Sequence, residues 1–144
     1  MKCNVNIIEK SDWIYYLNEN PSIKRDTCGK WQHFTSNLEH AKSICYKAVE
    51  EGAVKQAKHR KNLNPLKNDT VCCFYLDGDD LEGHKIIITF MLENNLIPKT
   101  KAGKLHNISF KFDNQTRNNE YGSNFKGEIK LEQFIDLSTG KWII

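Results

Sequence analysis

Side chains that can hold a phosphate group recur in two stretches of the sequence. Lys58 and Arg60 alternate with Ala57 and His59, and further along the chain Lys111 lies in a second alternating stretch. Arginine binds phosphate through paired hydrogen bonds, whereas lysine acts as a point charge. If both stretches are strands, alternation directs these cations to the polar face of a sheet. The chemistry predicted is the non-covalent binding of an anion.

The second stretch continues into a strongly polar loop. Ile108, Phe110 and Phe112 alternate with Ser109, Lys111 and Asp113, so one face packs and the other carries charge. The loop of residues 114–122 then supplies amides, a hydroxyl, a guanidinium and a phenol. Two interpretations stay open: a binding loop, or a solvated hairpin whose asparagines tolerate turn geometry.

The predicted ligand-binding set joins these cations to polar and aromatic neighbours: Lys58, Arg60, Lys111, Asp113, Thr116, Arg117, Tyr121 and Trp31. We expect Lys58, Lys111 and Arg117 to line one anion site, with Asp113 as an ion-pair organiser beside Lys111 and Arg117. Thr116 orients the site and Tyr121 closes it. Trp31, Tyr121 or Trp13 could stack on a base, and Trp31 has a second interpretation as an ordinary core tryptophan.

Catalysis has little support in the sequence. Asp113 with His59 or His33 could form an acid and base pair, but no nucleophile elbow, metal-ligand spacing or glycine-rich phosphate loop accompanies them. We therefore predict a binder rather than an enzyme, with no catalytic residue, metal or cofactor.

Composition indicates an ordinary globular chain. It has 144 residues, 39% hydrophobic and 27% charged, with a net charge of +3 and a basic cluster between Lys55 and Lys67. This length suits one domain, with residues 1–28 covering a core of residues 29–144. The sequence has no apolar run long enough to cross a bilayer, and its N-terminus lacks the apolar core of a signal peptide. We expect a cytoplasmic location, no membrane partner, and an anionic small molecule, nucleotide or RNA as the partner.

The five cysteines do not form a metal or disulfide pattern. Their number is odd and none is spaced as Cys-x-x-Cys. Cys45 lies on the apolar face of a predicted helix and Cys72 and Cys73 lie in a predicted strand, so we expect buried, redox-silent thiols.

Periodicity predicts the elements that position these residues. Residues 13–17 are read as a short helix and residues 29–35 as a strand. A Ser-x-x-Glu capping box at Ser36 predicts a helix that Gly52 ends. Strands follow at residues 54–61 and 70–77, the latter apolar enough for the centre of a sheet.

The second half of the chain adds one more helix and further strands. Asp79 or Asp80 is predicted to cap a helix whose buried stripe contains Ile86, Ile87, Phe90 and Met91. Strands are expected from residue 108 and again within residues 127–137. The order predicts an α+β fold, a mainly antiparallel sheet with two main helices on one face.

Several short motifs occur in an order typical of a known family: Gly29-Lys30-Trp31, the helix before Gly52, Ala57-Lys58, Phe74-Tyr75-Leu76-Asp77, and Lys111-x-Asp113-x-x-Thr116 with Tyr121. The chain thereby resembles the family of the basophilic-leukaemia-expressed protein and its bacterial relatives, across roughly residues 29–122. That resemblance implies a curved antiparallel sheet backed by helices, similar to the mRNA-cap-binding translation initiation factor.

Three functions remain in view. The first is a non-enzymatic binder of a nucleotide or phosphorylated small molecule, such as one that sequesters a signalling nucleotide. The second is a binder of RNA ends or single-stranded RNA, and the third is a protein-interaction module such as an inhibitor of a host or phage enzyme.

Overall fold

The computed structural model describes residues 4–18, 28–113 and 129–144. Its elements, in chain order, are β1 (Asn6–Lys10), β2 (Trp13–Leu17), β3 (Cys28–Thr35), α1 (Leu38–Glu50), β4 (Gln56–Arg60), β5 (Thr70–Asp77), α2 (Leu81–Glu93), β6 (Ser109–Phe112), β7 (Ile129–Lys130) and the 3-10 turn η1 (Leu131–Gln133).

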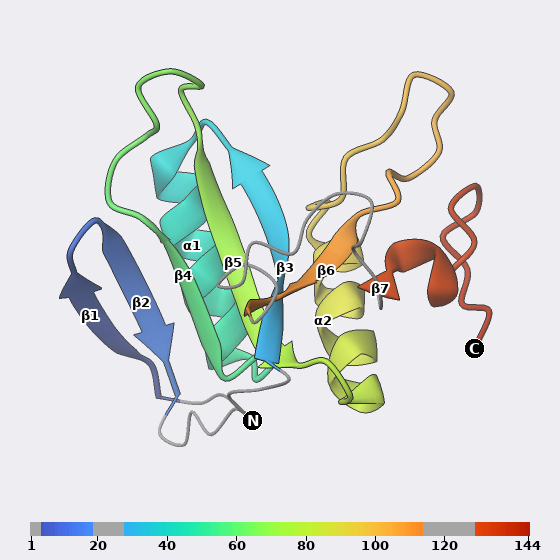
Figure 1. The fold of residues 1–144 in the computed structure, drawn as a ribbon, viewed down its shortest axis with the longest axis horizontal. Coiled ribbons are helices and arrows are strands. Elements are labelled where there is room, and N and C mark those ends of the chain that lie inside the picture. The colour runs from blue at the N-terminus through green and yellow to red at the C-terminus, as the bar shows by residue number, and fades with distance from the viewer. Residues whose placement is uncertain (1–3, 19–27, 114–128) are drawn as a thin grey trace.

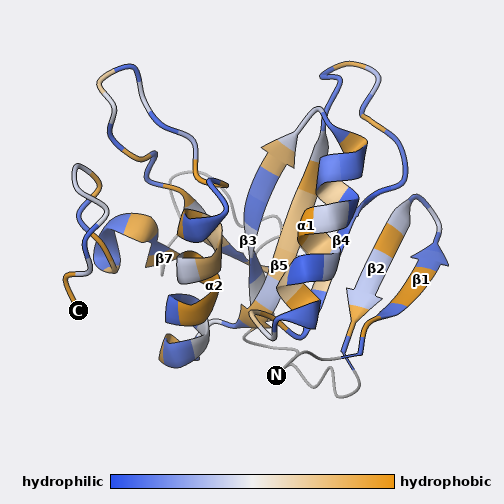
Figure 2. Cartoon of the chain, turned by 180° about the vertical axis from the view of Figure 1, so that it is seen from behind, coloured by the Kyte–Doolittle hydropathy of each residue, from blue (hydrophilic) through white to orange (hydrophobic). Residues whose placement is uncertain are grey.

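These strands form one antiparallel sheet with the order β1-β2-β4-β5-β3-β6-β7, which does not close on itself. Both helices pack on the same face (Figure 1) and are seen in front of the sheet when the molecule is turned around (Figure 2). The predicted α+β class is confirmed. Among the described residues, no helix combines the length and apolarity that a membrane span requires.

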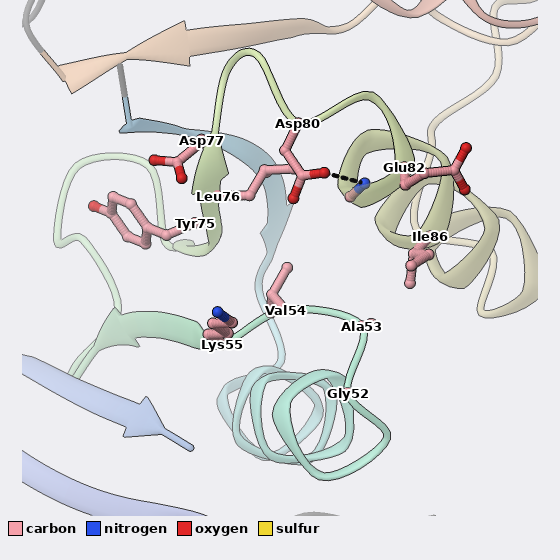
Figure 3. Close-up of a pocket in the computed structure, with 11 residues that line it drawn as sticks. Gly52, Ala53, Val54, Lys55, Tyr75, Leu76, Asp77, Asp80, Glu82 and Ile86 are labelled. Carbon is pink, nitrogen blue, oxygen red and sulfur yellow. Dashed lines mark hydrogen bonds between the residues drawn. The ribbon is translucent and has the colours of Figure 1, made fainter. Parts of the chain in front are cut away.

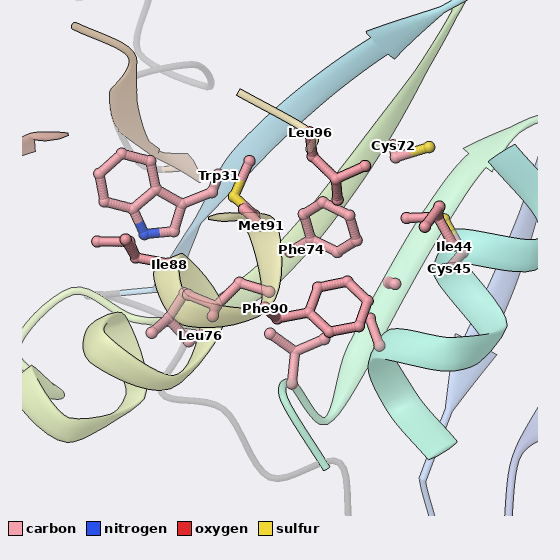
Figure 4. Close-up of a cluster of buried hydrophobic side chains, with 14 of the residues drawn as sticks. Trp31, Ile44, Cys45, Cys72, Phe74, Leu76, Ile88, Phe90, Met91 and Leu96 are labelled. Carbon is pink, nitrogen blue, oxygen red and sulfur yellow. The ribbon is translucent and has the colours of Figure 1, made fainter. Parts of the chain in front are cut away.

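The core lies between the sheet and the two helices (Figure 4). In β5, Phe74 is fully buried and pairs with Trp31 of β3 and Ala57 of β4, so all three side chains point toward the helices. The central position predicted for β5 is confirmed, because it lies between β4 and β3. Cys45, Cys72 and Cys73 are buried free thiols, as expected.

The helix ends follow local side-chain chemistry. The Oδ1 atom of Asn37 accepts a hydrogen bond from the His40 backbone N at 3.0 Å, so the N-cap of α1 is Asn37 and the predicted capping box at Ser36 is wrong by one residue. Gly52 follows the helix with φ 77°, and its left-handed conformation explains why the helix ends there. For α2, Asp80 caps the Gly83 backbone N at 3.0 Å, as predicted.

Two expectations about helices are wrong. Residues 13–17 form strand β2, in which Ile14 and Tyr16 are buried while Trp13 and Tyr15 point to the other face. This segment adds to the edge of the sheet, because β2 pairs with β4 along its length. In α2, Ile86 is 49% exposed and Ile88 takes its place in the buried stripe.

Candidate anion-binding face

Strand pairing places Lys58 and Lys111 on the same face of the sheet. Lys58 is paired with Cys73 in β5, and Lys30 is paired with both Tyr75 in β5 and Lys111 in β6. Cross-strand partners point to the same side, and Cys73 and Tyr75 are two residues apart, so all five side chains share one face. Since both helices cover the opposite face, we call this the helix-free face.

Lys58 and Lys111 are nevertheless well separated. Two strands, β5 and β3, lie between them, and their positions differ by two residues along the strands. Three strand spacings and this offset place their backbones roughly 16 Å apart. The Nζ atom of Lys58 lies 4.1 Å from the centre of the Trp13 ring in β2, on the side away from Lys111. One phosphate group does not contact both lysines in this arrangement of the side chains, and the single anion site expected from sequence stays a prediction.

Aromatic rings alternate with the cations on this face. Lys58 Nζ also lies 5.6 Å from the ring centres of Tyr15 and Tyr75, and the Arg60 guanidinium lies 5.2 Å from that of Trp13. Such cation–π contacts contribute roughly 0.5–1 kcal/mol each at exposed sites. The cation–aromatic face, as we define it, comprises Trp13, Tyr15, Lys30, Lys58, Arg60 and Tyr75.

Lys30 belongs to this surface, although sequence reasoning did not select it. Its Nζ atom lies 2.8 Å from Asp113 Oδ1 and 5.6 Å from the Tyr75 ring centre. Asp113 thus forms an ion pair as predicted, but with Lys30. The signal was present in the sequence, because Lys30 precedes Trp31 in an alternating strand and must point to the opposite face.

Burial and like charge both act on Lys58. Burial lowers the pKa of Lys58, and the neighbouring Lys30 and Arg60 lower it further, against the opposing effects of Cys73 and Asp113. Burial also raises the pKa of Tyr75, which keeps its phenol neutral. An incoming anion would relieve the repulsion among the three cations, so the electrostatics favour a negatively charged ligand.

Of the other predicted ligand residues, Trp31 lies away from this face. Trp31 is fully buried and its Nε1 donates to His84 Nδ1 at 3.1 Å, so the prediction that it contacts a ligand is wrong and the core interpretation holds. Thr116, Arg117 and Tyr121 lie outside the described residues. His59 is buried on the helix side of β4, so the sheet separates it from Asp113.

His33 is likewise separated from Asp113. It points to the helix side, as its neighbour Trp31 two residues away does, and bonds to Leu96 O at 2.8 Å. The acid and base pairs considered from sequence are therefore not assembled. Among the described residues, no group of three or more histidine, cysteine or acidic side chains is arranged to hold a metal ion.

Several cavities are lined by the described residues, among them one beside β3 and one beside β5. One, of about 680 Å³, lies where β3 extends beyond β6 and is lined by Phe34, Leu96, Ile108 and Lys111 among others, so it combines apolar walls with one cation. The other, of about 250 Å³, lies between the end of α1 and the start of α2 (Figure 3). Asp77, Asp80 and Glu82 line the second cavity together with a single cation, Lys55, and this acidic lining disfavours an anion.

The fold and this surface define an α+β protein with an unclosed antiparallel sheet and a basic, aromatic sheet face. Neither the known family models nor the curated proteins contain a match to this chain.

Proposed function

We propose that the protein binds a nucleotide or phosphorylated small molecule, without catalysing a reaction, through its cation–aromatic face. The observation that carries this proposal is the alternation of Lys30, Lys58 and Arg60 with three aromatic rings on one sheet face. Cations recognise phosphate, and aromatic rings provide stacking surfaces for bases. Tyr75 is only 7% exposed, so Trp13 and Tyr15 are the rings that we propose for stacking.

Lys58 has the central role in this proposal. Its ammonium group lies over Trp13, where a nucleotide base would stack, and a bound phosphate would draw the ammonium away from the ring. Hydrogen bonds to charged groups are typically worth about 1.5–3 kcal/mol, and stacking of one base about 1–3 kcal/mol. Removal of the Lys58 charge is thus expected to weaken a phosphate ligand at least tenfold.

Single-stranded RNA is the second candidate, because the cations extend across the sheet. The backbone separation of roughly 16 Å between Lys58 and Lys111 suits a ligand with several phosphates. Basic sheet faces with interleaved aromatic rings are used in this way by single-strand binders. We propose in addition that the fold is similar to that of the cap-binding initiation factor, and this similarity favours an RNA ligand.

The test is a titration that follows tryptophan fluorescence, with ATP, GTP and an eight-nucleotide single-stranded RNA as separate ligands. Lys58→Met keeps most of the aliphatic stem of Lys58 and removes the charge that lies over Trp13, and Lys101→Met is the matched control on an exposed loop. We expect Lys58→Met to raise the Kd at least tenfold and Lys101→Met to change it less than twofold.

Salt dependence separates the two candidates. A mononucleotide should give a shallow slope, whereas an oligonucleotide that neutralises several phosphates should lose affinity steeply as salt increases. If wild-type protein binds none of the three ligands at millimolar concentration, or if both lysine variants behave alike, the proposed face is not the binding site.

A further inference from the structure

Two histidine side chains meet on the helix side of the sheet. His33 lies in β3 and His40 in the first turn of α1, and their Nε2 atoms are 3.3 Å apart. Their ring planes are inclined by 76°, so the two nitrogens approach each other without the rings stacking. This pair takes no part in the proposed nucleotide site, because it lies on the opposite face of the sheet.

The separation of the two nitrogens matches one edge of a zinc coordination tetrahedron. Zinc binds imidazole nitrogen at about 2.0–2.1 Å, so two ligands at the tetrahedral angle are about 3.3–3.4 Å apart. At the right angle of square-planar or octahedral coordination, the same bond lengths place the nitrogens about 2.9 Å apart. The observed 3.3 Å therefore fits tetrahedral zinc better than those geometries.

Both histidines are held by their surroundings. Leu96 O lies 2.8 Å from His33 Nδ1 and can only accept a hydrogen bond, so this nitrogen carries a proton and the His33 Nε2 lone pair points at His40. A hydrogen bond from the second ring nitrogen to a backbone carbonyl is the usual support of a metal-binding histidine. The backbone N of His40 is fixed by the Asn37 cap.

No third histidine, cysteine or acidic ligand joins the pair among the described residues, so two coordination positions are left for water.

We propose that His33 and His40 form a two-histidine zinc site that links β3 to α1. The ion would replace the hydrogen bond between the two imidazoles, with Nε2 of each ring as a ligand, and the proton that His40 Nε2 now donates would move to Nδ1 of the same ring. Because the site joins a strand to a helix, zinc binding should raise the unfolding temperature as well as saturate at one ion per chain.

The experiment is calorimetric titration of the full chain with zinc chloride at pH 7.5, together with thermal unfolding with and without zinc. His40→Gln is the test variant, because it leaves the bond from His33 to Leu96 in place. His106→Gln is the matched control, since His106 is an exposed histidine in a loop. We expect wild type and His106→Gln to bind one ion with a Kd below about 1 mM, and His40→Gln to bind at least tenfold more weakly.

Cobalt provides a spectroscopic readout of the geometry. Co²⁺ in a tetrahedral site with nitrogen ligands gives intense visible absorption, which should appear with wild type and be lost in His40→Gln. The proposal is overturned if wild type binds no zinc below that concentration, or if His40→Gln retains wild-type affinity. Retained affinity would assign the binding to thiols or to other histidines.

Discussion

Replacement of Trp31 by Phe should destabilise the protein by about 2–4 kcal/mol without changing ligand affinity. The indole is fully buried, and its Nε1 donates to His84 Nδ1 at 3.1 Å. His84 is itself only 2% exposed, so the substitution leaves a buried acceptor without its donor, at about 1–3 kcal/mol. The smaller ring also leaves a cavity, which adds about 24 cal/mol for each Å³ that does not collapse.

Urea unfolding monitored by circular dichroism measures this loss directly. Trp142→Phe is the control, because Trp142 is 38% exposed and surface substitutions usually change stability by less than about 0.5 kcal/mol. A double-mutant cycle of Trp31→Phe with His84→Phe should give a coupling energy above about 0.5 kcal/mol, as expected for side chains in contact.

The reasoning would be refuted by either of two results. A loss below about 1 kcal/mol, equal to that of Trp142→Phe, would show that the indole hydrogen bond and packing contribute little. A tenfold loss of nucleotide affinity in folded Trp31→Phe protein would restore Trp31 to the ligand site and contradict its placement in the core.

Three further predictions concern the fold. Asn37→Ala should lower the free energy of unfolding by about 0.5–2 kcal/mol while Ser36→Ala changes it little, and equal losses in urea unfolding would argue against Asn37 as the cap. Gly29→Ala should lower the free energy of unfolding by about 1–3 kcal/mol, because its Cβ would overlap the backbone of β6. A urea midpoint equal to that of wild type would exclude this close approach. Burial lowers the pKa of both His59 and His84, so their stabilising contribution is full above about pH 6.5 and is lost as pH falls toward their folded-state pKa values. The urea midpoint should therefore be lower at pH 5.5 than at pH 7.5. An unchanged midpoint would contradict the inference that His59 and His84 are neutral in the folded protein.

Local sequence patterns predicted the elements whose signals are long or strongly periodic. The apolar run of residues 70–77 and the three- and four-residue spacing before Gly52 each extend far enough to distinguish a strand from a helix. Residues 13–17 are too few for that distinction. Their strand state depends on pairing with β4, which lies some forty residues later in the chain.

The sequence predicted which face of the sheet carries the candidate site, but not the distances between its residues. Alternation alone places Lys58 and Arg60 opposite Ala57 and His59, and the structure agrees. The separation of Lys58 from Lys111 instead depends on the strand order β4-β5-β3-β6, which no local pattern contains. The pairing of Asp113 with Lys30 likewise depends on two segments more than eighty residues apart in sequence, which strand pairing brings together.

The position of β3 has a consequence for synthesis of the chain on the ribosome. Both neighbours of β3 in the sheet, β5 and β6, come later in the sequence, so β3 emerges with no partner on either side. Its first partner, β5, is complete only at Asp77, about forty residues after β3 ends, which takes roughly 2–8 s at 5–20 residues per second. During that interval Trp31 has no core to enter, and β3 is an unpaired strand available to chaperones or to other nascent chains.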